Sequence, residues 1–220
     1  MKRIGIIGAG RFGSELAEHL ARRGAEIIVI ERDRKTVQRL SEIVPNVIQG
    51  DATELPALQE AGFHECDAVV VAIGLNMEGS ILATMNLKEL NVPYILAKAD
   101  SDSHGRVLER VGAHQVIYPD RERAVRLARS LMVGGDLDFF EIADGVSVLE
   151  MKAPERFIGK TLTETEIRKK YGVTVLAIRH EQPGGGKSKS IVSPMGDDRI
   201  EEGDTLVLFG PDRKLEALAE

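Results

Sequence analysis

The sequence predicts an α/β protein in which a doubly wound parallel sheet is followed by a small α+β domain. Up to about residue 131, short β-rich apolar runs alternate with stretches of helical apolar spacing, the pattern of a parallel sheet with helices on both faces. From Phe139 onward most runs are short and strand-like. We therefore expect a first domain over residues 1–131, a linker over 132–139 and a second domain over 140–220.

In the first domain each strand is a short run rich in Ile, Val or Ala, and each helix repeats apolar residues every three or four positions. In the first helix, Phe12, Leu16 and Leu20 share one side, and Gly24 follows its end. The expected strands are Ile4–Ile7, Glu26–Ile30, Val47–Gln49, Ala68–Ala72, Tyr94–Ala97 and Gln115–Tyr118. The expected helices are Arg11–Arg23, Asp33–Leu40, Glu54–Ala61, Met77–Leu90, Ser101–Arg110 and Asp120–Leu131.

The last of these helices leaves the sheet instead of feeding another strand. It carries Ala124, Leu127, Ala128 and Leu131 on one side, and an apolar face of this kind needs cover. We expect a second copy of the chain to cover it. The alternative is that this face packs on the chain's own second domain.

The second domain is expected to contain three strands and two short helices. The strands are Val146–Met151, Val173–Ile178 and Thr205–Phe209, and the helices lie near Thr163–Tyr171 and Asp212–Ala219. Pro183–Ser190 is a low-complexity stretch. We expect it to be a solvated hairpin loop between two strand-like runs.

Composition excludes several classes of protein. The chain has 220 residues and 43% hydrophobic residues, enough for two cores. Its apolar runs are too short to span a bilayer, and no charged start leads into an apolar signal region, so we expect a cytoplasmic protein without membrane insertion. A net charge of −6 argues against generic nucleic-acid binding. One cysteine, Cys66, and five histidines without ligand-like spacing give no metal site.

A glycine motif stands directly behind the first expected strand. Gly8 permits a tight strand-to-helix turn, Gly10 lets backbone N–H groups approach a phosphate, and Gly13 lets the helix pack on the strand. Glu31 ends the second strand, close to the roughly 20-residue spacing expected for the acid that binds the ribose hydroxyls. The motif therefore predicts a mononucleotide or dinucleotide site, although such glycines also occur in plain turns.

Further candidates for this site lie where strands end, because ligands of doubly wound sheets lie across the carboxyl ends of the strands. They are Arg32 after the second strand, Asp51, Ala52 and Thr53 near the adenine after the third, Ala72, Ile73 and Gly74 after the fourth, and Lys98 after the fifth. Strand ends also carry small or polar residues for structural reasons alone. The negative charge of Glu31 would repel a 2′-phosphate and so disfavours NADP. The positive charge of the neighbouring Arg32 weakens that argument.

Arg11 and Phe12 occupy the variable positions of the turn. A guanidinium at Arg11 is a ready clamp for a phosphate. This position suits a nucleotide with a free terminal phosphate, so ATP and ADP are favoured over NAD(H).

Several motifs together resemble those of the TrkA/KtrA family, the RCK (regulator of K⁺ conductance) subunits of bacterial potassium channels and transporters. The resemblance covers essentially the whole chain and is nearer to the KtrA branch than to the longer, duplicated TrkA branch. In the first domain the motifs are Gly8–Ser14, Gly50–Thr53, Val71–Gly74 and Leu108–Ala113, and in the second they are Gly159–Leu162 and Tyr171–Ile178.

The resemblance implies a gating ring at the inner face of the cell membrane. Dimers would assemble into an octamer under a membrane K⁺-translocating subunit, and ATP, ADP or NAD(H) would compete for the glycine site and change the shape of the ring. Arg11 would reach a terminal phosphate, in its own or a neighbouring subunit. Asp120 falls where relatives often place a glutamate near a cation, Mg²⁺ or Na⁺, beside the phosphates.

The resemblance also implies a second ligand, cyclic di-AMP, at a dimer interface of the second domain. Arg168 would meet a phosphate, and Leu162, Ile167 and Val175 would line an apolar bed for the bases. The alternative is that Arg168 is a solvated helix residue and that the three aliphatic residues are ordinary core.

Two other functions remain to be weighed. An NAD-dependent oxidoreductase would use the same glycine site, but it needs a positioned acid or base near the nicotinamide, and no such residue can be picked out. A DNA-binding repressor would need a helix-turn-helix segment and a basic face, and the sequence offers neither. We therefore expect a regulatory subunit and no enzyme, with the oxidoreductase as the alternative.

Overall fold

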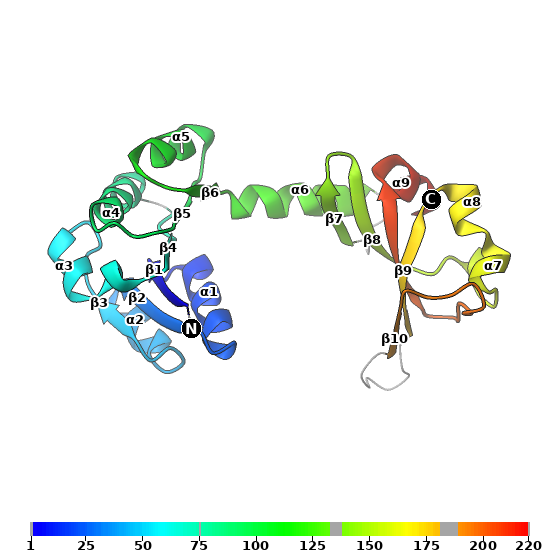
Figure 1. Ribbon diagram of the computed structural model, residues 1–220, viewed down its shortest axis with the longest axis horizontal. Helices are drawn as coiled ribbons and strands as arrows, with labels where there is room; N and C mark the ends of the chain where they lie inside the picture. Colours follow the sequence, from blue (N-terminus) through cyan, green and yellow to red (C-terminus); the bar gives the residue numbers. More distant parts are fainter. Residues whose placement is uncertain (1, 75, 133–137, 181–188, 220) are drawn as a thin grey trace. The chain divides into compact units, whose positions relative to one another are not determined.

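The structure is a computed structural model that describes residues 2–74, 76–132, 138–180 and 189–219 (Figure 1). Contacts divide the chain into two compact units, Met1–Asp120 and Arg121–Glu220. Most of the expected linker, residues 133–137, lies outside the described ranges. Met132 ends a helix and Asp138 begins a strand.

The first unit is built on a six-stranded sheet in the order β3-β2-β1-β4-β5-β6. All neighbouring strands are parallel, which confirms the doubly wound sheet. The strand order reverses between β1 and β4, where ligands of such sheets bind. The strands are β1 (Arg3–Ile7), β2 (Glu26–Glu31), β3 (Val47–Gln49), β4 (Ala68–Val71), β5 (Ile95–Lys98) and β6 (Gln115–Ile117).

The helices of the first half of the chain begin and end within a residue of the expected bounds. Asp33, Asn76 and Ser101 cap three of them with side-chain oxygens, as short polar residues do at helix starts. The helices are α1 (Arg11–Arg22), α2 (Arg34–Leu40), α3 (Leu55–Glu60), α4 (Met77–Glu89), α5 (Asp102–Val111) and α6 (Pro119–Met132), with a 3₁₀ turn η1 (Phe63–Glu65) that the sequence did not predict.

Both faces of this sheet are covered by helices (Figure 1). Alternate residues of a strand point to opposite faces, so Ile6 and Val29 join the core that includes Ala17 of α1, while Ile7 and Ile30 join the core beneath α3, α4 and α5. These four strand residues are at most 1% exposed. Burial of such a side chain contributes roughly 1.5–3 kcal/mol, so the sheet rigidly fixes the strand ends that carry the site.

The second unit has a five-stranded antiparallel sheet in the order β10-β9-β11-β8-β7, which confirms the small α+β domain. One face packs on helices, with Leu149, Ile178, Leu206 and Leu215 fully buried. The strands are β7 (Asp138–Ala143), β8 (Val146–Lys152), β9 (Thr174–His180), β10 (Lys189–Val192) and β11 (Thr205–Pro211). The helices are α7 (Leu162–Thr165), α8 (Ile167–Tyr171) and α9 (Asp212–Ala219), with a 3₁₀ turn η2 (Glu155–Phe157).

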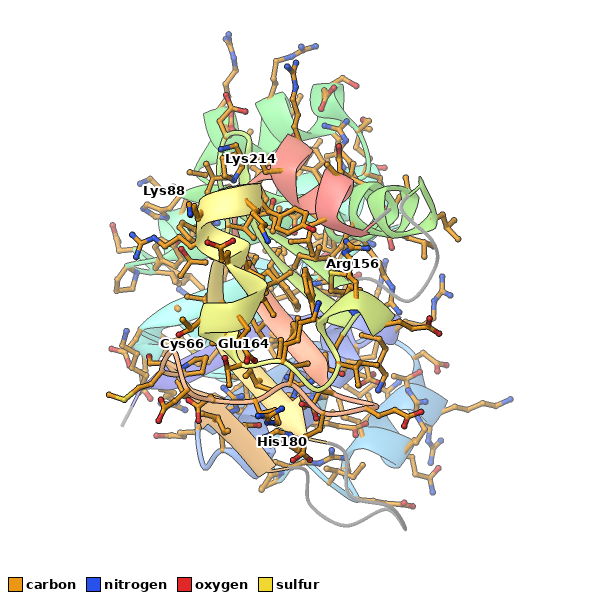
Figure 2. The ribbon with its side chains drawn as sticks, turned by 90° about the vertical axis from the view of Figure 1, so that its right-hand side faces the viewer. Cys66, Lys88, Arg156, Glu164, His180 and Lys214 are labelled. Carbon is orange, nitrogen blue, oxygen red and sulfur yellow. The ribbon has the colours of Figure 1, made fainter. Side chains whose placement is uncertain are left out.

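Arg156 and His180, both labelled in Figure 2, hold parts of the second unit together. The Arg156 guanidinium lies 5.1 Å from the ring centre of Phe157 and donates to the carbonyl oxygen of Leu218 near the end of α9. Nδ1 of His180 lies 2.7 Å from Oδ1 of Asp204, a buried carboxylate. The first contact ties α9 to the turn η2, and the second ties the loop before β11 to strand β9.

The second unit differs from expectation in three places. The single helix expected near Thr163–Tyr171 is two helices, α7 and α8, because Glu166 adopts a left-handed φ of +50° between them. Strand β7 was not expected, and β10, the strand-like run expected after the hairpin loop, had been given no bounds. Strand β10 begins inside the stretch Pro183–Ser190, whose residues 183–188 lie outside the described ranges.

Candidate functional site

The turn after β1 has the geometry that its glycines predict. Gly8 has a φ of +88°, and a Cβ added there would lie 3.2 Å from Cγ1 of Ile73. A Cβ added at Gly13 would lie 2.0 Å from the carbonyl oxygen of Gly8. The first turn of α1 therefore packs directly on the glycine turn, and neither position has room for a side chain.

Gly10 is different, because nothing lies within 4 Å of a Cβ added there. It is the N-cap of α1, has no side chain to cap the helix, and no acidic residue stands in the first helical turn. Free N–H groups and the positive end of the helix dipole thus face open space, an arrangement that attracts an anion. This space is the candidate phosphate site.

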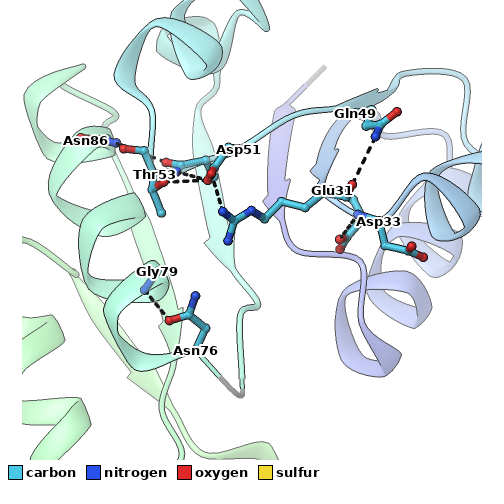
Figure 3. Close-up of polar contacts among 10 residues, drawn as sticks. Glu31, Asp33, Gln49, Asp51, Thr53, Asn76, Gly79 and Asn86 are labelled. Carbon is cyan, nitrogen blue, oxygen red and sulfur yellow. Dashed lines mark hydrogen bonds and ion pairs between the residues drawn. The ribbon is translucent and has the colours of Figure 1, made fainter.

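The Glu31 carboxylate lies beside this turn (Figure 3). Its Oε2 accepts a hydrogen bond from Ala9 N at 2.5 Å, and its Oε1 accepts one from Asp33 N at 2.9 Å. An ionised carboxylate offers about four acceptor positions, so both oxygens retain capacity for ribose hydroxyls. Sequence reasoning predicted the position of Glu31 but missed these two backbone contacts.

Polar residues after β2 and β3 form a connected network (Figure 3). Arg32 is ion-paired with Asp51 at 2.6 Å, and Asp51 accepts from the Thr53 hydroxyl at 2.7 Å. Burial raises the pKa of Asp51, but the hydrogen bonds from Thr53 and the Arg32 charge outweigh it, and the net pKa is lowered. Asp51 is thus held ionised, and its charge holds Arg32 at the carboxyl edge of the sheet.

Asn86 of α4 completes this network and was missed by the sequence reasoning. Its side-chain amide donates to the carbonyl oxygens of Ala52 and Thr53 at 3.2 and 2.9 Å. The sequence carries no clear signal for this role, because α4 also has other polar residues, Ser80 and Thr84 among its buried ones. Its role is to fix the loop after β3.

The ends of β4 and β5 meet in a second cluster. Ala72 and Ile73 pack against Gly13 and Gly8, and a Cβ added at Gly74 would lie 3.4 Å from Nζ of Lys98. Lys98 is ion-paired with Asp120 at 3.0 Å and with Asp100 at 3.6 Å. Asp120 therefore has an ammonium partner, and among the described residues no three His, Cys, Asp or Glu side chains lie close enough to hold a metal. The cation at Asp120 stays a prediction.

Arg11 and Phe12 behave differently in the turn. Arg11 is exposed at the start of α1, which leaves it available to a ligand. Phe12 is half-buried against the core between α1 and the sheet, so its contribution is to packing. The structure thus brings the candidate residues of four strand ends to one edge of the sheet.

Comparison with known proteins identifies the family. A family model described as the TrkA-N domain matches residues 4–119, and one described as the TrkA-C domain matches residues 146–220. The chain belongs to the TrkA family. Among its relatives are Ktr system potassium uptake proteins C and A of Bacillus subtilis, 36% and 34% identical, each over 95% of this chain and over 92% and 91% of the relative. These matches confirm the resemblance that the motifs indicate.

Solved structures give the same fold for this TrkA-family chain. The GsuK RCK domain is similar over 99% of this chain, with 25% identity and a TM-score of 0.54, but the match spans only 45% of that protein. A structure of GsuK bound to ADP matches 59% of this chain and 34% of that protein, with 27% identity and a TM-score of 0.50.

The candidate second site in the TrkA-C domain is only partly open. Arg168 is exposed on α8, but Ile167 is 3% exposed and belongs to the core, against which Leu162 and Val175 pack. Ile167 thus fits the alternative of ordinary core. The cyclic di-AMP site stays a prediction that rests on Arg168.

Proposed function

We propose that this chain is a cytoplasmic, nucleotide-binding regulatory subunit of a membrane K⁺ uptake system. The observation that carries the proposal is the open space above Gly10, where the uncapped start of α1 faces a site flanked by Glu31 and Arg11. Support comes from the similarity to Ktr potassium uptake proteins over nearly their whole length. None of the helices described is long and apolar enough to cross a membrane, so translocation of K⁺ would fall to a partner.

The proposed ligands are ATP and ADP, with NAD(H) as the competing dinucleotide. The exposed Arg11 supports a terminal phosphate, and the structure of GsuK bound to ADP supports an adenine nucleotide in such a domain. The role is regulatory and not catalytic. NADH should therefore keep its absorbance in the presence of the protein and small carbonyl compounds, whereas an NAD-dependent oxidoreductase would consume it.

We further propose a homodimer that assembles to an octamer. Leu127 and Leu131 of α6 are 58% and 67% exposed, and Ile142 of β7 is 63% exposed. Large apolar side chains exposed to this extent mark interaction surfaces. A monomeric mass by light scattering at tens of micromolar protein, with nucleotide present, would contradict this part of the proposal.

The test of the ligand is calorimetric titration of the full chain with ATP, ADP, NAD and NADH, beside a Gly10→Ala variant as the matched control. Saturable binding to the wild type that is weakened about ten- to a hundredfold in the variant supports the proposal. The test of function is K⁺ uptake in bacteria lacking their own uptake systems, expressing a K⁺-translocating membrane protein with or without this chain. Equal uptake with the wild type, the Gly10→Ala variant and no chain would overturn the regulatory role.

A further inference from the structure

Helices α4 and α5 pack on each other (Figure 1), and a buried histidine lies in their contact. His104, in the first turn of α5, is 1% exposed, and Ser80 of α4 is fully buried. Nε2 of the His104 ring lies 2.7 Å from Oγ of Ser80, and Nδ1 accepts a hydrogen bond from Asp100 N at 3.5 Å. One imidazole ring therefore joins α4, α5 and the loop after β5.

These contacts fit the neutral form of the ring. The Ser80 hydroxyl donates to the carbonyl oxygen of Met77 at 3.1 Å, so it accepts from Nε2–H of His104. Nδ1 then carries no hydrogen and can accept from Asp100 N. A proton added at Nδ1 would face the hydrogen of this N–H group, and it would also place a charge in a buried site. The charged ring therefore cannot keep the contact with the loop after β5.

The charges around the ring also favour its neutral form. Burial lowers the pKa of His104, and the Asp100 carboxylate opposes this shift only in part. Lys98 is ion-paired with that carboxylate at 3.6 Å, which weakens its attraction for a proton on the ring. Helix α4 faces the ring with the neutral hydroxyl of Ser80, and the hydroxyl of Tyr118 lies against the next residue of α5. Protonation therefore requires a movement that brings water or the Asp100 carboxylate to the ring.

The loop held by His104 is connected to the glycine turn of the candidate nucleotide site. A Cβ added at Gly74 would lie 3.9 Å from both carboxylate oxygens of Asp100. A Cβ added at Gly8 would lie 3.2 Å from Cγ1 of Ile73, the residue before Gly74. Contacts thus run from the glycine turn through the loop after β4 to the loop after β5.

We propose that His104 is a proton-sensitive joint of the first unit. Its neutral ring holds the loop after β5 against α4 and α5, and a proton at Nδ1 releases this loop and weakens nucleotide binding at the neighbouring glycine turn. Only the effect on binding rests on the proposed function. Because coupling between two ligands is reciprocal, a bound nucleotide also makes the proton harder to bind. The joint is closed above about pH 6.5, the ordinary pKa of histidine, and opens as the pH falls below it.

Hydrogen exchange of the full chain without nucleotide tests the joint itself. Protection factors of the amides of residues 100–105, which correct for the intrinsic effect of pH on exchange, should fall between about pH 7.5 and pH 5.5 in the wild type. They should stay nearly constant in His104→Gln, whose amide can still donate to Ser80 but does not titrate. Asp100→Asn keeps the histidine and removes the carboxylate that favours the proton, so its loss of protection should begin at a lower pH. This variant decides the matter if His104→Gln does not fold. His19→Gln, which removes an exposed histidine from α1, is the matched control and should follow the wild type.

Titration with ADP and NAD at the same two pH values tests the effect on binding. Both Kd values should be about two- to tenfold higher at the lower pH in the wild type, because one competing proton changes an affinity at most about tenfold per pH unit. In His104→Gln the Kd for NAD should not change with pH. The terminal phosphate of ADP itself titrates at about pH 6, so for ADP the histidine's share is the difference between the two proteins.

The outcomes separate this inference from the proposed function. Protection of residues 100–105 that is constant in the wild type, or is lost equally in His104→Gln, would overturn the joint. An equal dependence of binding on pH in the two proteins would overturn its effect on the nucleotide and leave the proposed function standing. Failure of the wild type to bind either nucleotide at about pH 7.5 would overturn the proposed function and this effect, and the exchange result would still decide the joint.

Discussion

Substituting Gly10 and Gly13 by alanine, one at a time, should separate ligand binding from folding. At Gly10 the φ of −62° suits any residue, and the added methyl group meets nothing within 4 Å. Alanine is a poorer N-cap than glycine, which destabilises the fold by up to about 1 kcal/mol. Alanine also lowers the conformational entropy of the unfolded chain, which stabilises the fold by about 0.4–1 kcal/mol. The two effects nearly cancel, so the Gly10→Ala variant should unfold within about 2 °C of the wild type.

Binding should respond much more strongly than stability at Gly10. The methyl group fills the space in which a phosphate would meet the free N–H groups of α1. Losing one charge-assisted hydrogen bond costs about 1.5–3 kcal/mol, so the Kd for ADP should rise about ten- to a hundredfold. Adenosine, which has no phosphate, should bind both proteins alike.

Gly13→Ala provides the opposite case. The added Cβ would lie 2.0 Å from the Gly8 carbonyl oxygen and 3.3 Å from Cβ of Ala72, so α1 must shift away from the turn. Overpacking of this kind costs about 1–3 kcal/mol, equivalent to a Tm about 4–12 °C lower. Urea and thermal unfolding measure the stability of the two variants. Calorimetric titration with ADP measures their affinity for the nucleotide. Wild-type affinity for ADP in a folded Gly10→Ala protein would refute the assignment of the phosphate site, and an undiminished Tm in Gly13→Ala would refute the packing argument.

Three further results are expected. Arg11→Ala should weaken ATP binding by about ten- to a hundredfold and leave adenosine nearly untouched; equal losses for both would remove Arg11 from the phosphate site. Burial lowers the pKa of His104, and the nearby Asp100 carboxylate opposes this shift only in part. The folded protein therefore favours neutral His104. This contribution to stability is fully present above the unfolded pKa near 6.5 and is lost as the pH falls below it. The urea midpoint should therefore drop more between about pH 7.5 and pH 5.5 in the wild type than in His104→Gln, and parallel drops would contradict the assignment. Leu127→Glu should lower the oligomeric mass in light scattering, while the exposed Glu122→Gln should leave it unchanged.

The first unit was predicted nearly completely, because its signals are local and repeated. The central residues of β2 and β4 form uninterrupted apolar runs, and α1 repeats apolar residues on one side. The glycine turn followed from its motif and Glu31 from its distance along the chain, whereas Lys98 followed from the rule that ligands lie at the carboxyl ends of the strands. The contacts of Asn86 and Asp100 did not follow, since they depend on how α4 and the loop after β5 lie in space.

The second unit was predicted less completely, although two of its signals are visible in the sequence. Strands β7 and β8 are joined by Asp144 and Gly145, the latter with a φ of +71°, and Asp-Gly between strand-like runs is a hairpin signal. Thr161 and Glu164 form a capping box that starts α7, a pattern readable as S/T-x-x-E. The break at Glu166, which has a φ of +50°, has no such signal, because a left-handed glutamate is uncommon.

Glu31 holds the glycine turn through a hydrogen bond from Ala9 N, a contact made within the protein itself. The entropy lost in ordering the turn therefore belongs to the folding free energy of the unit and not to the free energy of binding. A nucleotide would meet a rigid receptor, so competing ligands would be distinguished by the groups they carry beyond the first phosphate.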